Sequence, residues 1–317
     1  MRTHRRIGVG AALTAAVALA ALPAGSALGA GTVIYDTVPD PKPGNVDSYA
    51  YEANGVRQFG DQLAFAAGPR QLREITVLMS SWGCQSGHWY SNDCVSAPGS
   101  TFSHPITVNV YAVGPGGTVG ALLATSTHTF AIPFRPSASA SCTGVDAGKW
   151  FEASTSTCHN GYATPITFDL ASLNVTLPSN VIVSIAYNTT HYGAAPIGES
   201  AACYASAGGC GYDSLNVGLI DPALTQSVGV NPAPSDAYQD NVFGFNYCDG
   251  GAAGTNVFRL DAGCWAGFKP ALHLTASFAT AATKDRCKEG GFMTLSRADG
   301  TSFSNQGDCI QYVNTGK

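Results

Sequence analysis

Hydrophobic and polar residues alternate along most of this chain, which is the pattern of β-strands with one buried face. Over residues 106–113, Ile106, Val108 and Val110 fall on one side of the predicted strand and mainly polar residues fall on the other. The same alternation predicts further strands over residues 32–36, 62–66, 75–79, 122–126, 166–170, 173–177, 181–187, 215–219 and 271–277. A helical period is almost absent, so the pattern indicates an all-β protein.

Glycine and proline separate the predicted strands, as in the Gly-Pro-Gly-Gly segment at 114–117 and the proline-rich segment at 39–44. Many short strands without intervening helices are typical of antiparallel sheets. We therefore expect residues 31–280 to form a two-sheet antiparallel sandwich of jelly-roll type with disulfide-closed loops.

The first thirty residues have the layout of a secretory signal peptide rather than of a folded segment. Residues 1–6 are basic, residues 7–22 are rich in Ala, Leu and Val, and residues 23–30 are small. This apolar run is short for a membrane span and no second one follows it. The sequence therefore predicts a secreted, extracellular protein that leaves the membrane after cleavage of residues 1–30.

Export changes the charge of the chain. The full sequence has 16 basic and 21 acidic residues, and three arginines leave with the signal, so 13 basic residues stand against 21 acidic ones, a net charge of −8. An acidic protein without a basic patch is a poor match for nucleic acid or anionic membranes, and neither is expected as a partner.

Ten cysteines in an exported chain indicate disulfides. Their spacing favours pairing between neighbours, in loops of about 7 to 22 residues that would each stabilise the fold by roughly 2–4 kcal/mol. The expected pairs are Cys84–Cys94, Cys142–Cys158, Cys203–Cys210, Cys248–Cys264 and Cys287–Cys309.

The last residues, 284–317, are predicted to form a separate small module behind a linker at 281–283. A segment of this size buries too little surface to fold by itself, so it should depend on the bridge between Cys287 and Cys309.

Two resemblances follow from particular motifs. The tail, with Cys-Lys-Glu-Gly-Gly-Phe at 287–292 and Asn-Gln-Gly-Asp-Cys-Ile-Gln-Tyr-Val at 305–313, resembles a short cysteine-paired C-terminal module of secreted bacterial proteins. The body resembles a group of exported bacterial β-sandwich proteins, some of which carry C-terminal surface-sorting anchors. The motifs that carry this second resemblance lie at residues 59–62, 79–82, 104–107 and 187–193. Both resemblances imply secretion, the second also implies a β-sandwich, and neither implies a catalytic residue.

A metal centre is not expected from the cysteines, because Cys84 and Cys94 are too far apart in sequence for a zinc site and oxidising conditions favour disulfides. No cofactor is predicted. A structural calcium ion stays open as an alternative, because the acidic segments 36–47 and 236–240 offer oxygen ligands, although ordinary turns also use Asp in this way.

The evidence for catalysis is weak. Ser200, with His191 nearby, stands in a sequence that faintly resembles a nucleophile elbow, but the elbow belongs to a parallel α/β sheet. Glu199 with Asp213 or Glu152 would be a glycosidase pair only if the two carboxyl groups met in one cleft. No catalytic residue is assigned.

The placement of tryptophan is more informative. Trp89 and Trp150 lie inside predicted disulfide loops, and Trp82 and Trp265 lie beside cysteines. Aromatic rings on rigid loops can stack on sugar rings, while neighbouring polar side chains bond the hydroxyls. The alternative is that each tryptophan only packs against its disulfide. The candidate ligand-binding residues are Trp89, Tyr90 and Trp150 for stacking, with His88, Asn92 and Asp93 as polar partners.

The favoured function is therefore non-enzymatic binding of an extracellular polysaccharide, cell-surface glycan or cell wall through aromatic loops. Two alternatives stay open. One is a structural or adhesive surface protein whose aromatic residues are all buried, and the other is a secreted hydrolase that acts on polysaccharide.

Overall fold

The computed structural model describes residues 31–187, 215–224, 227–281, 283–297 and 299–317. The predicted signal peptide, the pair Cys203–Cys210 and the hydrolase candidates His191, Glu199, Ser200 and Asp213 lie outside these residues.

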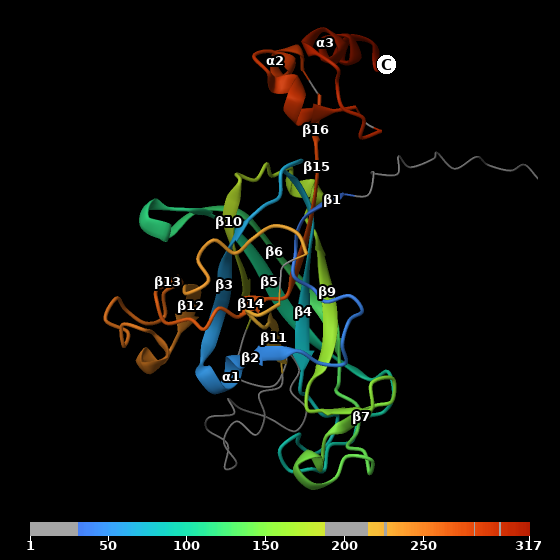
Figure 1. Cartoon of the computed structure of the whole chain (residues 1–317), viewed down its shortest axis with the longest axis vertical. Helices are drawn as coiled ribbons and strands as arrows, with labels where there is room; N and C mark the ends of the chain where they lie inside the picture. Colours follow the sequence, from blue (N-terminus) through green and yellow to red (C-terminus); the bar gives the residue numbers. More distant parts are fainter. Residues whose placement is uncertain (1–30, 188–214, 225–226, 282, 298) are drawn as a thin grey trace, which may run out of the picture.

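Two antiparallel sheets make up the body (Figure 1). The first sheet has the strand order β1-β15-β4-β11-β14, with β2 paired to β11 and β9 paired to β4. Its strands are β1 (Thr32–Asp36), β2 (Asp47–Tyr49), β4 (Gln71–Ser81), β9 (Tyr162–Asp169), β11 (Leu215–Ile220), β14 (Lys269–Pro270) and β15 (Leu272–Ser277).

The second sheet has the strand order β13-β12-β3-β10-β5-β6. Its strands are β3 (Val56–Ala64), β5 (Thr101–Val113), β6 (Val119–Pro133), β10 (Asn180–Ala186), β12 (Ala237–Asn241) and β13 (Arg259–Asp261). One short helix, α1 (Tyr51–Asn54), precedes β3 and ends at Gly55 in the left-handed conformation.

One hydrophobic core joins the two sheets, because the buried residues of both belong to a single cluster. In β5, Ile106, Val108 and Val110 are buried in this core, as their alternation predicts. The opposite face of β5 carries polar contacts instead, such as the hydrogen bond between the hydroxyls of Thr107 and Thr127, which lie 2.7 Å apart.

The strand predicted over residues 173–177 is wrong. A 3₁₀ turn, Ala171–Leu173, occupies its beginning, and Asn174 takes a left-handed backbone conformation with φ of 53°. Asn adopts this conformation more readily than most residues, so it ends the extended chain although its neighbours alternate. Only one isolated bridge, between Gln71 and Thr176, remains of the expected pairing in this segment. Each of the other nine predicted segments overlaps a strand of the two sheets.

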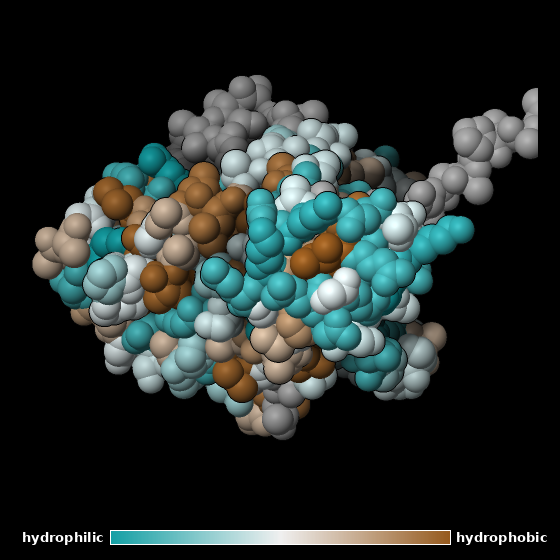
Figure 2. All heavy atoms as spheres, turned by 90° about the horizontal axis from the view of Figure 1, so that it is seen from above, coloured by the Kyte–Doolittle hydropathy of each residue, from teal (hydrophilic) through white to brown (hydrophobic). Residues whose placement is uncertain are grey.

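The C-terminal residues form a small structure beyond one end of the body (Figure 1). It contains α2 (Lys284–Cys287), a 3₁₀ turn (Gly291–Thr294), α3 (Gln306–Thr315) and the parallel pair β16 (Ala279–Thr280) and β17 (Leu295–Ser296). It has a core of its own, made of Ala281, Cys287, Leu295, Phe303 and Cys309. Seen from this end, hydrophobic residues are interspersed with hydrophilic ones on the surface (Figure 2). None of the helices in the described part of the chain is both long and apolar enough to cross a membrane.

Four of the five expected disulfides are confirmed: Cys84–Cys94, Cys142–Cys158, Cys248–Cys264 and Cys287–Cys309. Each closes a local loop, as the spacing of the cysteines predicts.

Candidate binding surface at the stapled end

The loops closed by the first two disulfides pack against each other at the end of the body opposite the C-terminal module (Figure 1). We call residues 82–100 and 134–162 the stapled end. The first segment leads from β4 to β5, and the second leads from β6 to β9 and contains the hairpin of β7 (Trp150–Glu152) and β8 (Thr157–His159). The backbone amide of Ala138 donates to the carbonyl of Cys94 over 3.0 Å, so the two segments form one unit.

Arg135 ties these segments together. Its backbone amide donates to the carbonyl of Gly83 over 2.9 Å, and its Nη2 donates to the carbonyl of Gly148 over 2.7 Å. The side chain is 0% exposed, and burial lowers the pKa of this guanidinium to about 10, which still leaves it charged at neutral pH. Nη1 has no hydrogen-bond partner among the described residues.

Trp89 lies at the tip of the first loop, but it does not project freely into solvent. Its ring is half-buried and meets the ring of Trp82 edge to face, with centroids 4.7 Å apart. Trp82 is fixed in turn by a hydrogen bond from its Nε1 to the hydroxyl of Ser80, 2.9 Å long. Trp89 therefore anchors the tip on the body rather than standing out from it.

The more exposed ring of this tip is that of Tyr90, which is 48% exposed. The rings of His88 and Tyr90 are stacked, with centroids 5.2 Å apart and planes 22° apart. The loop beneath them is fixed by the amide of His88, which donates to Asp93 Oδ1 over 2.9 Å, and by Asn92, whose φ of 61° turns the chain. Asn92 and Asp93 are both exposed beside the stacked pair.

Trp150 is a packing residue in this structure. It is only 6% exposed, and its Nε1 donates to the carbonyl of Gly161 over 2.7 Å. The rings of His159 and Tyr162 lie within 5.0 and 5.6 Å of its centroid. A sugar has no open face of this ring on which to stack, so of the sequence-derived set only the residues of the first loop remain accessible.

Two cavities open at or beside the stapled end. The larger, of about 730 Å³, is lined by residues 96–101, residues 133–140 and Tyr162. The other, of about 490 Å³, lies between the proline-rich segment and the end of β11. Its lining residues are Pro39, Pro41, Pro43, Asn45, Val46, Asp47, His159, Leu219, Ile220, Asp221 and Leu224. Both volumes are in the range of small-molecule sites, roughly 300–1,000 Å³.

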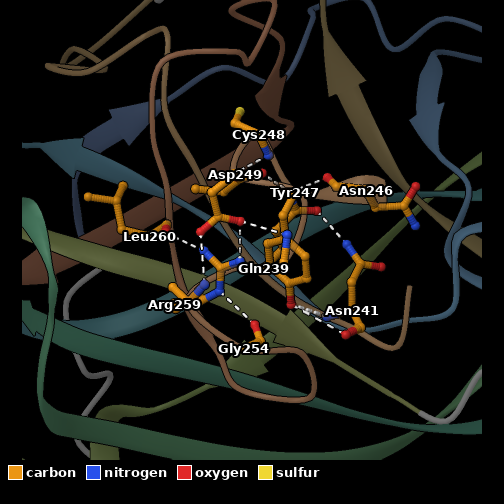
Figure 3. A network of polar contacts seen from close by, with 12 residues as sticks. Gln239, Asn241, Asn246, Tyr247, Cys248, Asp249, Gly254, Arg259 and Leu260 are labelled. Atoms are coloured by element: carbon orange, nitrogen blue, oxygen red, sulfur yellow. Dashed lines mark hydrogen bonds and ion pairs between the residues drawn. The ribbon is translucent and has the colours of Figure 1, made fainter. Parts of the chain in front are cut away.

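The loop closed by Cys248 and Cys264 is held by a polar network (Figure 3). The guanidinium of Arg259 lies 3.8 Å from the centroid of the Tyr247 ring and pairs with Asp249 over 2.8 Å. Asp261 accepts from the amide of Cys248 over 2.8 Å. These groups mostly satisfy one another, so the network serves to fix the loop.

Metal ligands are not gathered at the calcium candidates. Among the described residues, three convergent His, Cys, Asp or Glu ligand atoms occur at Cys248, Asp261 and Cys264, and both of these cysteines are in a disulfide. Neither segment 36–47 nor segment 236–240 supplies such a group, and calcium at either place stays a prediction.

Glu152 is the one described member of the predicted glycosidase pairs. Its Oε2 accepts from the Thr155 hydroxyl over 2.8 Å and lies 3.1 Å from His159 Nε2. These contacts lower the pKa of Glu152, with the Thr155 hydrogen bond as the largest cause. A carboxyl group with a lowered pKa is a poor general acid at neutral pH.

Arg135 and the cavity that it lines were missed at the level of sequence. An arginine between phenylalanine and proline in a predicted loop carries no signal of burial, because arginines in loops are usually exposed. Its burial depends on the packing of two segments that are joined only in three dimensions.

Comparison with known proteins adds no further constraint: no family model matches the sequence, and no curated protein or solved structure matches it.

Proposed function

We propose that this is a secreted, non-enzymatic protein that binds extracellular polysaccharide or cell-surface glycan through the stapled end. We also infer that residues 1–30 direct its export and that the two sheets are connected as a jelly roll.

The observation that carries this proposal is the exposed ring of Tyr90, stacked on the partly buried ring of His88 in a loop closed by a disulfide. The flat face of an aromatic ring covers the apolar face of a pyranose, while exposed groups such as Asn92 and Asp93 can bond its hydroxyls. The disulfide and the packing of Trp89 order the loop before a ligand arrives, so binding costs little conformational entropy.

The rival functions make different demands on the same residues. A purely structural surface protein needs no exposed ring at a rigid tip, so the exposure of Tyr90 favours binding. A polysaccharide hydrolase needs a carboxyl group poised as a general acid, and the lowered pKa of Glu152 argues against that residue.

The test is retention of the purified protein on insoluble chitin, cellulose and bacterial cell-wall material. We expect Tyr90→Ala to weaken binding to the retaining polymer about tenfold, equivalent to about 1.4 kcal/mol of lost stacking. Phe245→Ala is the matched control, because Phe245 is 79% exposed on a different loop and its removal should leave retention unchanged.

Equal loss in both variants, or no loss in either, would contradict the assignment of the Tyr90 surface. Failure of the wild-type protein to bind any of the polymers would favour the structural alternative.

A further inference from the structure

The charge of Arg135 has no counter-charge in the described part of the chain. None of the ion pairs found there includes this residue, and its hydrogen bonds go to the backbone carbonyls of Pro136 and Gly148. Burying a charge without a partner of opposite sign is costly, and apolar side chains of similar size would often tie two loops together as well. Packing alone therefore does not explain why a charged guanidinium occupies this position.

The cavity of about 730 Å³ beside Arg135 has walls suited to an anion. Its lining contains no acidic residue, and Arg135 is the only charged residue among those that form it. Hydroxyl groups come from Ser96, Ser100, Ser137 and Ser139. Ser100 and Ser137 already donate their hydroxyl protons to the carbonyls of Ala97 and Ser96, so they can only accept from a ligand. The hydroxyls of Ser96 and Ser139 accept from the amides of Gln85 and Ser141, which leaves their protons to donate to a carboxylate.

A second cation stands close to the same wall. Lys42 Nζ lies 5.3 Å from the centroid of the Tyr162 ring, and Tyr162 lines the cavity. The same ammonium group donates to the carbonyl of Ala163 over 2.9 Å, which holds it in place. Lys42 itself is not part of the lining and also interacts with Glu152, so Arg135 supplies the charge of the cavity wall and Lys42 adds positive charge behind Tyr162.

From this combination we infer that the cavity binds the carboxylate of a uronic acid residue, which would make acidic polysaccharides the preferred ligands. The guanidinium is fully covered, so it attracts the carboxylate across the cavity wall as a fixed charge while the serine hydroxyls make the direct contacts.

The choice of a sugar acid over another carboxylate rests on the proposed glycan-binding function. The wall of the cavity and the loop that carries Tyr90 share one hydrogen-bonded stem, because the amide of Ala97 donates to Gln85 Oε1 over 2.9 Å and Ser86 bridges Val95. A polysaccharide chain could then place one residue against Tyr90 and a charged residue in the cavity.

The experiment compares binding of polygalacturonate with that of neutral dextran, and of glucuronate with that of glucose, at low and high salt. We expect the acidic member of each pair to bind at least about tenfold more tightly at low salt, and the difference to shrink as salt screens the charge. Ala97→Asp should abolish this preference, because it places a negative charge on the cavity wall at an exposed position.

Ala121→Asp is the matched control, since it adds the same charge at an exposed position on β6 away from the cavity and should leave the preference intact. Equal affinity for glucuronate and glucose, or equal effects of the two aspartates, would overturn the inference. Binding of poly-glutamate as tight as that of polygalacturonate would show that the cavity recognises charge alone, which overturns the assignment to a sugar acid.

Tyr90→Ala separates this inference from the proposed function. If it weakens polymer binding but glucuronate still binds in preference to glucose, both ideas stand. If Tyr90→Ala changes nothing while Ala97→Asp removes acidic binding, the Tyr90 surface fails and the cavity site stands. If Tyr90→Ala alone matters, the proposed function stands and the cavity site fails.

Discussion

Replacing Cys287 and Cys309 together by alanine should unfold the C-terminal module and leave the two-sheet body folded. The bridge spans 22 residues, so its loss releases about 3 kcal/mol of chain entropy to the unfolded module. It also alters two of the five buried residues of the module's own core, Ala281, Cys287, Leu295, Phe303 and Cys309. A core of this size cannot offset such a loss, since small domains rarely hold more than about 3–5 kcal/mol.

Limited trypsin digestion followed by mass spectrometry measures this effect at a single site. In the folded module, Arg297 pairs with Asp308 over 2.6 Å and covers the Phe303 ring at 4.8 Å, so the peptide bond that follows it should be protected. The double variant should be cut after Arg297, while arginines in the body strands, such as Arg73 in β4, stay protected.

The matched control is the pair Cys142→Ala and Cys158→Ala, whose bridge spans 16 residues in the body. It should lower the unfolding temperature of the body but keep Arg297 protected. Continued protection of Arg297 in the Cys287/Cys309 variant would refute the reasoning, because it would show that the module is stable without its bridge.

Two further changes test the packing of the body. Gly161→Ala should destabilise the protein by about 1–3 kcal/mol. The added Cβ would come within 2.6 Å of Trp82 Nε1 and disturb the hydrogen bond that this nitrogen donates to the Ser80 hydroxyl. An unchanged thermal unfolding temperature would contradict this. Burial raises the pKa of Asp61 well above its usual value, so the folded protein keeps a proton that the unfolded chain releases above about pH 4. Stability should therefore fall as pH rises from about 4 through that raised pKa, and Asp61→Asn should remove this loss; equal slopes in the two proteins would count against it.

Much of the fold could be predicted from sequence because its determinants are local. Alternation in β5 follows directly from the burial of every second side chain, and it marks Ile106, Val108 and Val110 correctly. The disulfides are also local, since each described bridge closes a loop between neighbouring cysteines. The ten-residue helix α3 is less visible, because only Cys309 among its residues is fully buried and it therefore lacks a clear apolar stripe.

The candidate site depended on contacts that the sequence does not encode locally. Trp150 and Tyr90 are both aromatic residues in cysteine loops, yet one is 6% and the other 48% exposed. The two rings differ in the partners that they meet. Trp150 lies against β9, whose residue Tyr162 contacts it, whereas Tyr90 lies in a turn and contacts the rings of its chain neighbours His88 and Trp89. Only the folded chain distinguishes the two.

The association of tryptophan with cysteine thus has a structural cause at this end of the body. The two loops are polar, so the packing of their interior depends on the rings of Trp82, Trp89 and Trp150. The indole nitrogen of Trp82 donates to the Ser80 hydroxyl, and that of Trp150 donates to the Gly161 carbonyl. Because the tryptophans are used for this support, the loop can present smaller rings to solvent without losing its shape. A ligand would then meet Tyr90 and His88 as a preformed surface, and the tryptophans would contribute to affinity by keeping that surface rigid.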